Sequence, residues 1–297
     1  MFGIFSRKLK DKKVDLASSN LWKDSLTKFR NNKVALISLI MLVTLVLLSI
    51  VIPWFLPWSY DQVDWGVSFP SAPSWSHFLG TDNNGRDVLV RCLYGLRMSF
   101  LIGVLASLIS LVIGVVYGSI AGYFGGRTDQ FMMRIVDIML SLPFMFFVIL
   151  LMVVFGRHFF LIFISLGLVG WLVMARIVRA ETISIKNKEF IEAAKSYGAS
   201  NTRIIFKHII PNLLGVIIIY ITLTIPEIIL TESFLSFLGL GVQEPMASLG
   251  LLISDGSRAL DLYAWLFWPP TILLAAILFC FNFIGDGIRD ALDPKQK

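Results

Sequence analysis

The residues of this chain with types and spacing suited to chemistry are concentrated in a polar stretch between apolar segments, residues 190–212 and the turn before it. The charged residues there are Lys186, Lys188, Lys195, Arg203 and Lys207, with Glu181, Glu189 and Glu192. Glu192-Ala193-Ala194 stands at its centre, followed by Gly198 and Pro211. Two alanines beside one carboxylate form a small flat surface that holds a substrate poorly. Such a surface lets the groove of another protein approach closely, so the pattern predicts docking.

Local signals predict that this stretch folds as a helix–turn–helix on the water side of a membrane. Residues 190–195 favour a helix, and Gly198 ends it because glycine adopts positive φ without steric cost. Ser200 or Asn201 can cap a second short helix that runs to about residue 207. Pro211 then stands at the start of the next apolar helix, where no amide hydrogen is needed.

A second polar group, Asp82, Arg86 and Asp87, lies in the turn-rich segment 57–98. Asp82 or Asp87 can cap a turn or helix. Arg86 and Asp87 can form a local ion pair, or they can contact an extracytoplasmic partner. The residue types leave both interpretations open.

Acidic residues inside apolar segments form a third group: Asp137, Glu227 and Glu232. A charge against hydrocarbon costs about 2.5–3.5 kcal/mol on insertion scales, so we expect Glu227 to face a translocation pathway. Pro226 weakens the backbone ladder there, as in helices that line cavities. The alternative for Glu227 is an ion pair with a sister subunit. Glu232 points about 140° away around the helix and is interpreted as a packing or partner-facing group.

Other kinds of site have no support in the sequence. There is no hydrolase constellation and no Walker-A glycine loop, so we expect no catalytic residues and no ATP bound by this chain. The only cysteines, Cys92 and Cys280, provide neither a disulfide framework nor a metal site. The net charge of +6 follows membrane topology along the chain and does not indicate nucleic-acid binding.

Composition indicates an all-α polytopic membrane protein of one compact domain. The 297 residues are 56% hydrophobic and 15% charged, with a mean hydropathy of +0.77, whereas soluble domains carry about 25% charged residues. Six segments can cross a hydrocarbon core of about 30 Å: residues 34–55, 99–123, 131–155, 159–179, 213–239 and 263–284. Gly114, Gly118 and Gly122 place a packing stripe on the second segment. Pro143, Pro226 and Pro269-Pro270 are expected to bend their helices inside the spans.

The expected organisation has five parts. They are a cytoplasmic N-terminal segment 1–33, a first transmembrane helix 34–56, an extracytoplasmic loop 57–98, a five-helix core 99–286 holding the docking loop 180–212, and a cytoplasmic tail 287–297. Trp22, Leu26 and Phe29 share one helical face, which predicts an interfacial helix, although a solvated basic tail is the alternative. With both termini inside, 21 of the 26 Lys and Arg residues are cytoplasmic and five are outside. This asymmetry is what the positive-inside rule requires.

Several motifs resemble one transporter family. Glu192, Ala193, Ala194, Gly198 and Pro211 match the pattern E-A-A-x3-G-x9-I-x-L-P of permease subunits in ABC-type importers, with His208 and Ile210 replacing its isoleucine and leucine. The sequence Gly80-Thr81-Asp82 through Gly85-Arg86-Asp87 resembles the dipeptide, oligopeptide and nickel branch. Residues 144–151, 174–179, 232–241 and 282–294 resemble its C-type oligopeptide permeases, so the likeness covers roughly residues 21–294.

This resemblance implies a type I ABC importer permease fold in the bacterial cytoplasmic (inner) membrane. It implies a heterodimer with a sister permease, two cytoplasmic ATPase subunits that hold ATP and Mg, and an extracytoplasmic peptide-binding protein. The expected function is oligopeptide import, coupled to the ATPases through the Glu192 loop. A permease for dipeptides or nickel is the alternative within the branch. An ion-coupled secondary transporter is a remote alternative, because such carriers bury matched ionisable residues near the midplane.

The predicted topology can be tested by cysteine labelling after Cys92 and Cys280 are replaced. A cysteine at Ser74 should react with a membrane-impermeant thiol reagent once the outer barrier is opened, because segment 57–98 is expected outside. A cysteine at Ser200 should stay unlabelled. The reverse pattern would overturn the orientation.

Overall fold

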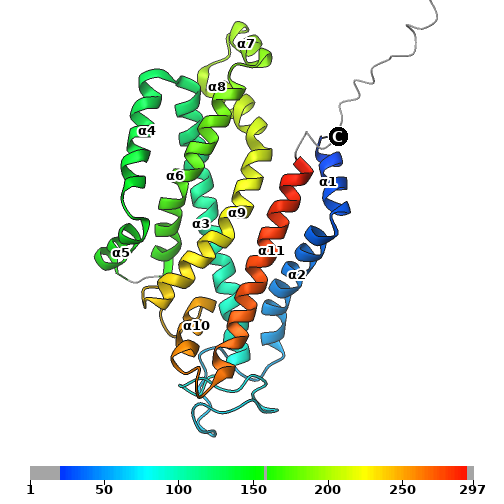
Figure 1. The fold of residues 1–297 in the computed structure, drawn as a ribbon, viewed down its shortest axis with the longest axis vertical. Coiled ribbons are helices and arrows are strands. Elements are labelled where there is room, and N and C mark those ends of the chain that lie inside the picture. The colour runs from blue at the N-terminus through cyan, green and yellow to red at the C-terminus, as the bar shows by residue number, and fades with distance from the viewer. Residues whose placement is uncertain (1–20, 157–158, 293–297) are drawn as a thin grey trace, which may run out of the picture.

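The computed structural model describes residues 21–156 and 159–292, and within them the chain is built from helices and loops. Figure 1 shows their arrangement. The helices are α1 Leu21–Asn31, α2 Lys33–Val51, η1 Ile52–Trp54, α3 Val88–Phe124, α4 Gly126–Ser141, α5 Phe144–Phe155, α6 Phe159–Ile185, α7 Glu189–Ser196, α8 Asn201–Ile204, the π-helix η2 Ile205–Ile209, α9 Ile210–Phe237, α10 Leu249–Arg258, η3 Ala264–Leu266 and α11 Trp268–Leu292.

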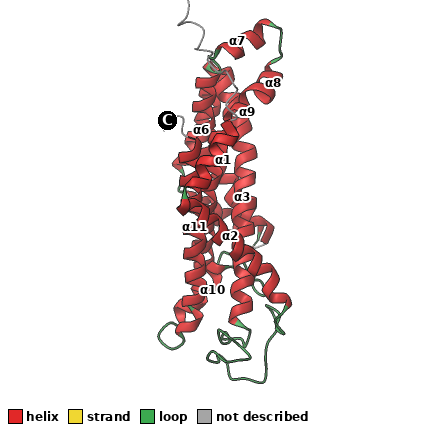
Figure 2. Cartoon of the chain, turned by 90° about the vertical axis from the view of Figure 1, so that its right-hand side faces the viewer, coloured by secondary structure: helices red, strands yellow, loops and turns green. Residues whose placement is uncertain are grey.

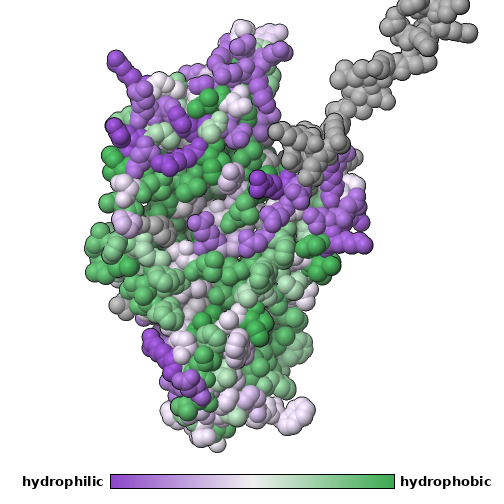
Figure 3. Space-filling view, viewed as in Figure 1, coloured by the Kyte–Doolittle hydropathy of each residue, from purple (hydrophilic) through white to green (hydrophobic). Residues whose placement is uncertain are grey.

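The long helices run side by side along the molecule, and the two ends differ in character. Helices α1, α7 and α8 lie at one end, while α10 and the loop between η1 and α3 lie at the other (Figures 1 and 2). Hydrophilic residues gather at the α7 end, and hydrophobic residues cover a broad band below it (Figure 3). Among the described residues, five helices are long and apolar enough to cross a membrane, and the bent pair α4–α5 can make a sixth.

The glycine stripe of α3 is a helix-packing surface, as predicted, and its partner is α6. A Cβ added at Gly114 would lie 2.6 Å from the Cβ of Met174, and one at Gly122 would lie 2.7 Å from the Cβ of Thr182. At Gly118 it would meet the backbone carbonyl of Ala175. The two helices therefore approach closely over two turns, which small residues permit where no aqueous hydrophobic force acts between helices.

The third expected span, residues 131–155, is not one continuous helix. Helix α4 ends at Ser141, α5 begins at Phe144, and their axes differ by 84°. Pro143 explains the break because it lacks an amide hydrogen and disfavours helical geometry at the residue before it. Leu142 is accordingly extended, with φ −80° and ψ 135°. Bending at Pro143 is confirmed, although the bend is sharp enough to separate two helices.

Other boundaries also differ from the sequence-based expectation. Helix α3 begins at Val88, well before residue 99, because the Asp87 side chain caps the backbone N–H of Val90. The pair Pro269-Pro270 lies inside the apolar span Ala264–Leu292, as predicted, but in the first turn of α11, a position that tolerates proline. Pro226 lies inside α9 without ending it.

The first helix, α1, packs against α2 and α11. Phe29 of α1 is half-buried beside Gly287 of α11, whereas Leu26 is exposed. One face of α1 therefore contacts the bundle and another remains free, which fits an interfacial helix. Most of the expected N-terminal segment, residues 1–20, and the last five residues of the expected tail lie outside the described part of the chain.

Gly118→Ala should destabilise the bundle, because the new methyl group meets backbone of α6 that must shift. Overpacking of this kind costs about 1–3 kcal/mol, which a lower thermal unfolding midpoint of the purified protein in detergent would report. Gly215→Ala is the matched control, since the nearest atom to its added Cβ is 3.9 Å away. Equal midpoints for the two variants would contradict the close contact.

Candidate functional site

The predicted helix–turn–helix is present as α7 and α8. Gly198 has φ +77°, and the Ala199 N–H donates to the Ala194 carbonyl at 3.1 Å, which is the wide turn that ends helices at glycine. The Ser200 hydroxyl accepts a hydrogen bond from the Arg203 N–H at 3.3 Å and caps α8. The stop at Gly198 and the cap at Ser200 are therefore confirmed.

One buried residue anchors α7 while the opposite side faces outward. Ile191 is fully buried in a cluster with Ile204 and Ile209. Glu192 and Ala193 are exposed and Ala194 is partly exposed. The α7–α8 loop thus presents its small-residue surface without help from another chain, as docking requires.

An exposed aromatic residue that was not predicted from the sequence lies beside this surface. Tyr197, at the end of α7, is 92% exposed. A tyrosine offers a large apolar body with a polar tip, which is why it is enriched at protein interfaces. The signal available in the sequence was its place between the alanine pair and the turn glycine.

The second helix of this loop, α8, is joined to the membrane helix α9 without a break. Helix α8 continues through the π-helix η2 into α9, so residues Asn201–Phe237 form one 37-residue helix. Pro211 lies in the first turn of α9, as predicted. The wider π turn immediately before it makes room for the proline ring, whose nitrogen has no hydrogen to donate to the helix hydrogen bonds. Arg203 is exposed on this helix. Helix α8 and the membrane helix α9 are therefore parts of one continuous element.

A cavity of about 430 Å³ lies between the α4–α5 pair, α6 and α9. Glu227 lines it and is exposed. Pro226 is buried and does not line it. The cavity volume falls within the roughly 300–1,000 Å³ of ligand pockets.

The other two intramembrane acids have partners within the chain, Asp137 at an exposed position and Glu232 at a buried one. Asp137 of α4 pairs with Arg176 of α6 at 2.5 Å. Glu232 is fully buried and accepts hydrogen bonds from Ser99 at 3.4 Å and Ser236 at 2.7 Å. The packing interpretation of Glu232 is confirmed. In the described residues, Glu227 alone of the three faces the cavity.

At the other end of the molecule, the polar group of the loop before α3 forms an internal network. The Arg86 guanidinium donates to Asp82 at 2.8 Å and to Glu244, in the α9–α10 connection, at 2.7 Å. Arg86 is only 6% exposed. The same guanidinium holds the pKa of Glu244 below its usual range. The expected ion pair between Arg86 and Asp87 is therefore wrong in its partner: Arg86 pairs with Asp82 and with Glu244, a residue far along the chain.

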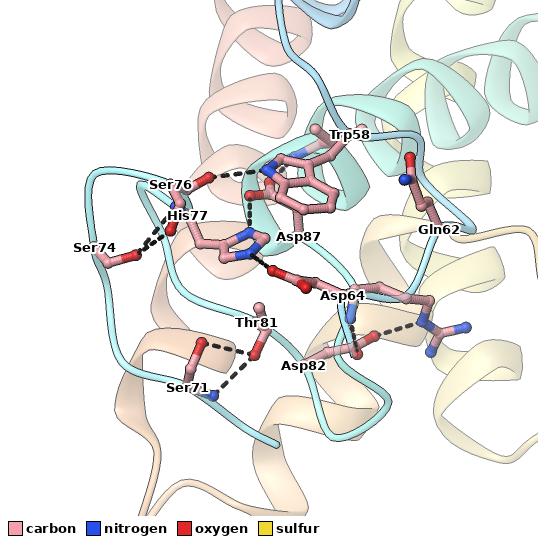
Figure 4. A network of polar contacts seen from close by, with 12 residues as sticks. Trp58, Gln62, Asp64, Ser71, Ser74, Ser76, His77, Thr81, Asp82 and Asp87 are labelled. Atoms are coloured by element: carbon pink, nitrogen blue, oxygen red, sulfur yellow. Dashed lines mark hydrogen bonds and ion pairs between the residues drawn. The ribbon is translucent and has the colours of Figure 1, made fainter. Parts of the chain in front are cut away.

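Asp87 belongs to a second part of this network, around His77. The two ring nitrogens of His77 lie 2.9 Å from Asp87 and 3.2 Å from Asp64 (Figure 4). The backbone N–H of Gly66 and the His77 ring lower the pKa of Asp64. Since Asp87 also caps α3, His77 connects the start of that helix to the preceding loop. Asp87 is buried and contributes to folding of this loop.

Comparison with known proteins assigns the family. The sequence model of a family described as "Binding-protein-dependent transport system inner membrane component" matches residues 114–297. The chain belongs to this family. A second model, the "N-terminal TM domain of oligopeptide transport permease C", matches residues 20–73. The protein is therefore a multi-pass inner-membrane component of an ABC importer with a type I permease fold.

Relatives of this permease match over almost its whole length. The oligopeptide transport system permease protein OppC of Haemophilus influenzae is 51% identical over 96% of this chain and 92% of its own length. OppC of Escherichia coli is 50% identical over 96% and 95% of the two chains. The dipeptide transport system permease protein DppC of Bacillus subtilis is 44% identical over 96% and 89%.

A solved structure, the inward-facing MetNI methionine ABC transporter, shares the permease fold. Its matching chain has a TM-score of 0.55 and 20% identity, covering 69% of this chain and 96% of the other. At this identity the likeness concerns the fold alone.

Arg86→Gln should lower the thermal unfolding midpoint of the permease more than Glu244→Gln. Losing Arg86 leaves Asp82 and Glu244 with only the longer contacts to Arg91, at 3.3 and 4.0 Å, and breaking a buried charge pair costs about 3–5 kcal/mol. Glu244, in contrast, is 51% exposed, and its loss leaves Arg86 paired with Asp82. Arg127→Gln, at an exposed arginine, is the control. The opposite order of the first two variants would exclude Arg86 as the centre of the network.

Proposed function

We propose that this chain is the transmembrane permease subunit of an ATP-driven importer that moves oligopeptides into the cytoplasm. The observation that supports this most directly is 51% and 50% identity over 96% of the chain to two proteins named as oligopeptide permeases. The chain performs no covalent chemistry and binds no cofactor in this proposal. ATP and Mg belong to partner subunits.

The partners follow from the family and from the two ends of the molecule. Two cytoplasmic ATPase subunits hydrolyse ATP, and one of them receives the α7–α8 loop at Glu192, Ala193 and Ala194. A sister permease forms a heterodimer with this chain and completes the pathway. An extracytoplasmic peptide-binding protein delivers cargo at the end that holds the loop before α3. Both termini are cytoplasmic, as the charge asymmetry requires.

ATP binding and transport are coupled through one equilibrium between two conformations, which the nucleotide sites of the ATPases and the cavity of the permease both influence. Closure of the ATPase pair on ATP displaces α7, and the continuous helix from Asn201 to Phe237 carries that displacement to the cavity. Glu227 lies on this helix and faces the cavity. Nucleotide state and cavity orientation are then coupled because each has a different free energy in the two conformations.

Dipeptides are a second candidate cargo, favoured by the 44% identity to a dipeptide permease. Uptake of labelled dipeptides and pentapeptides by the assembled complex in proteoliposomes separates the two proposals. Transport of pentapeptides with ATP and binding protein supports the first. Transport of dipeptides alone overturns it.

An ion-coupled transporter is less well supported, because among the described intramembrane acids only Glu227 faces the cavity. Co-isolation of ATPase subunits with the purified chain discriminates against this mechanism. Uptake that persists without ATPase subunits and depends on an ion gradient would establish it instead.

Ala194→Arg should reduce peptide uptake about tenfold or more, since each 1.4 kcal/mol lost from docking weakens binding tenfold. Gly198→Val should have a similar effect, because φ +77° is strained for a β-branched residue. ATP-dependent uptake in proteoliposomes and co-purification of the ATPase subunits measure the two effects. Gln130→Arg, on the exposed surface of α4, is the control for added bulk and charge. Normal uptake by both loop variants would reject the docking assignment.

A further inference from the structure

The polar lining of the cavity comes from one face of α9. Tyr220, Thr224, Glu227 and Thr231 line it at spacings of four, three and four residues, which places them in one row along a helix. The opposite wall, from α4, α5 and α6, is apolar: Met139, Leu142, Phe147, Val169, Val173 and Ile177. The cavity therefore has one polar side and one apolar side.

Three residues of this row, Thr224, Glu227 and Thr231, can only accept hydrogen bonds from a ligand, and we call them the acceptor stripe. The Thr224 hydroxyl donates its hydrogen to the Tyr220 carbonyl at 2.7 Å, and the Thr231 hydroxyl donates to the Glu227 carbonyl at 2.8 Å. A hydroxyl has one hydrogen, so these oxygens keep only lone pairs for the cavity. Within the described residues, 21–156 and 159–292, no cationic side chain forms an ion pair with the Glu227 carboxylate.

A ligand that suits the acceptor stripe carries a cation and a row of N–H donors. Glu227 and Thr231 are four residues apart, about 6 Å along a helix axis. Alternate residues of an extended chain are separated by about 6.6 Å. An ammonium group at Glu227 therefore brings the amide N–H two residues further along the peptide near Thr231.

We propose that the acceptor stripe binds the free amino terminus and the main chain of an extended peptide during translocation. This rests on the proposed function of peptide import. Glu227 pairs with the terminal ammonium, and Thr231 accepts from the amide of the third residue. Peptide side chains lie against the apolar wall, which can hold varied side chains because it offers them no fixed polar partner. The stripe thus selects for the peptide main chain.

Transport of a pentapeptide and its N-acetylated form tests the proposal. Both are supplied to the assembled complex in proteoliposomes at concentrations that saturate the binding protein, and each variant is compared with wild type for the same peptide. Glu227→Gln should reduce uptake of the free peptide about tenfold, which is about 1.4 kcal/mol, and change uptake of the acetylated peptide little. Glu227→Asp, which keeps the negative charge, should reduce uptake of the free peptide less than Glu227→Gln does.

Threonine variants test the main-chain contact separately. Thr231→Val should reduce uptake of both peptides, because the amide of the third residue is present in each. Thr222→Val is the matched control: Thr222 is also on α9 and donates to a backbone carbonyl at 2.7 Å, but it is buried away from the cavity. Its uptake should match wild type.

The outcomes separate this inference from the function on which it rests. Equal loss of both peptides in Glu227→Gln, with ATPase subunits still co-purifying, would overturn ammonium recognition while leaving peptide import intact. Unchanged uptake in both Glu227→Gln and Thr231→Val would overturn the whole stripe. Uptake of neither peptide by the wild-type complex would instead contradict peptide import itself.

Discussion

The continuous helix from Asn201 to Phe237 is the constraint on which the rest of this permease depends. In hydrocarbon, each backbone N–H and carbonyl must be paired within the protein, and Pro211 and Pro226 both remove an N–H from this helix. A π turn precedes the first proline, and the second lies buried among neighbouring helices. Because the helix continues past both prolines, its start at Asn201, next to the α7–α8 turn, and the cavity residue Glu227 lie on one element, about 39 Å apart along its axis.

The other long helices form the surface against which α9 packs. Glycines bring α3 and α6 into close contact, and two charge pairs, Arg176–Asp137 and Arg179–Asp129, tie α4 to α6. The break before Phe144 then turns α5 away at 84°. Tightly packed contacts of this kind tend to have discrete alternative arrangements. The cavity lies between α4–α5, α6 and α9.

Charged residues at the far end hold α3 and α9 in register. Arg86 stands just before α3, and its partner Glu244 stands in the connection between α9 and α10. Nearby, Arg91 is fully buried, and its Nε and one terminal nitrogen have no hydrogen-bond partner among the described residues. A buried charge of this kind is costly and needs its surrounding carboxylates. The end of the molecule away from the α7–α8 loop is therefore held by charge pairs together with a hydrophobic cluster that includes Val88, Leu252 and Leu266.

The sequence by itself determined the features that depend on neighbouring residues. The apolar lengths of most spans, the stop at Gly198, the cap at Ser200 and the glycine row of α3 all follow from local geometry and composition. The tertiary structure alone decided which surfaces meet: α6 as the partner of the glycines, Glu244 as the partner of Arg86, and the cavity in front of Glu227 and Thr231. It also decided that Pro143 separates two helices whereas Pro226 does not. Periodicity along a chain determines which face a residue occupies, but what that face contacts depends on segments brought together only when the bundle packs.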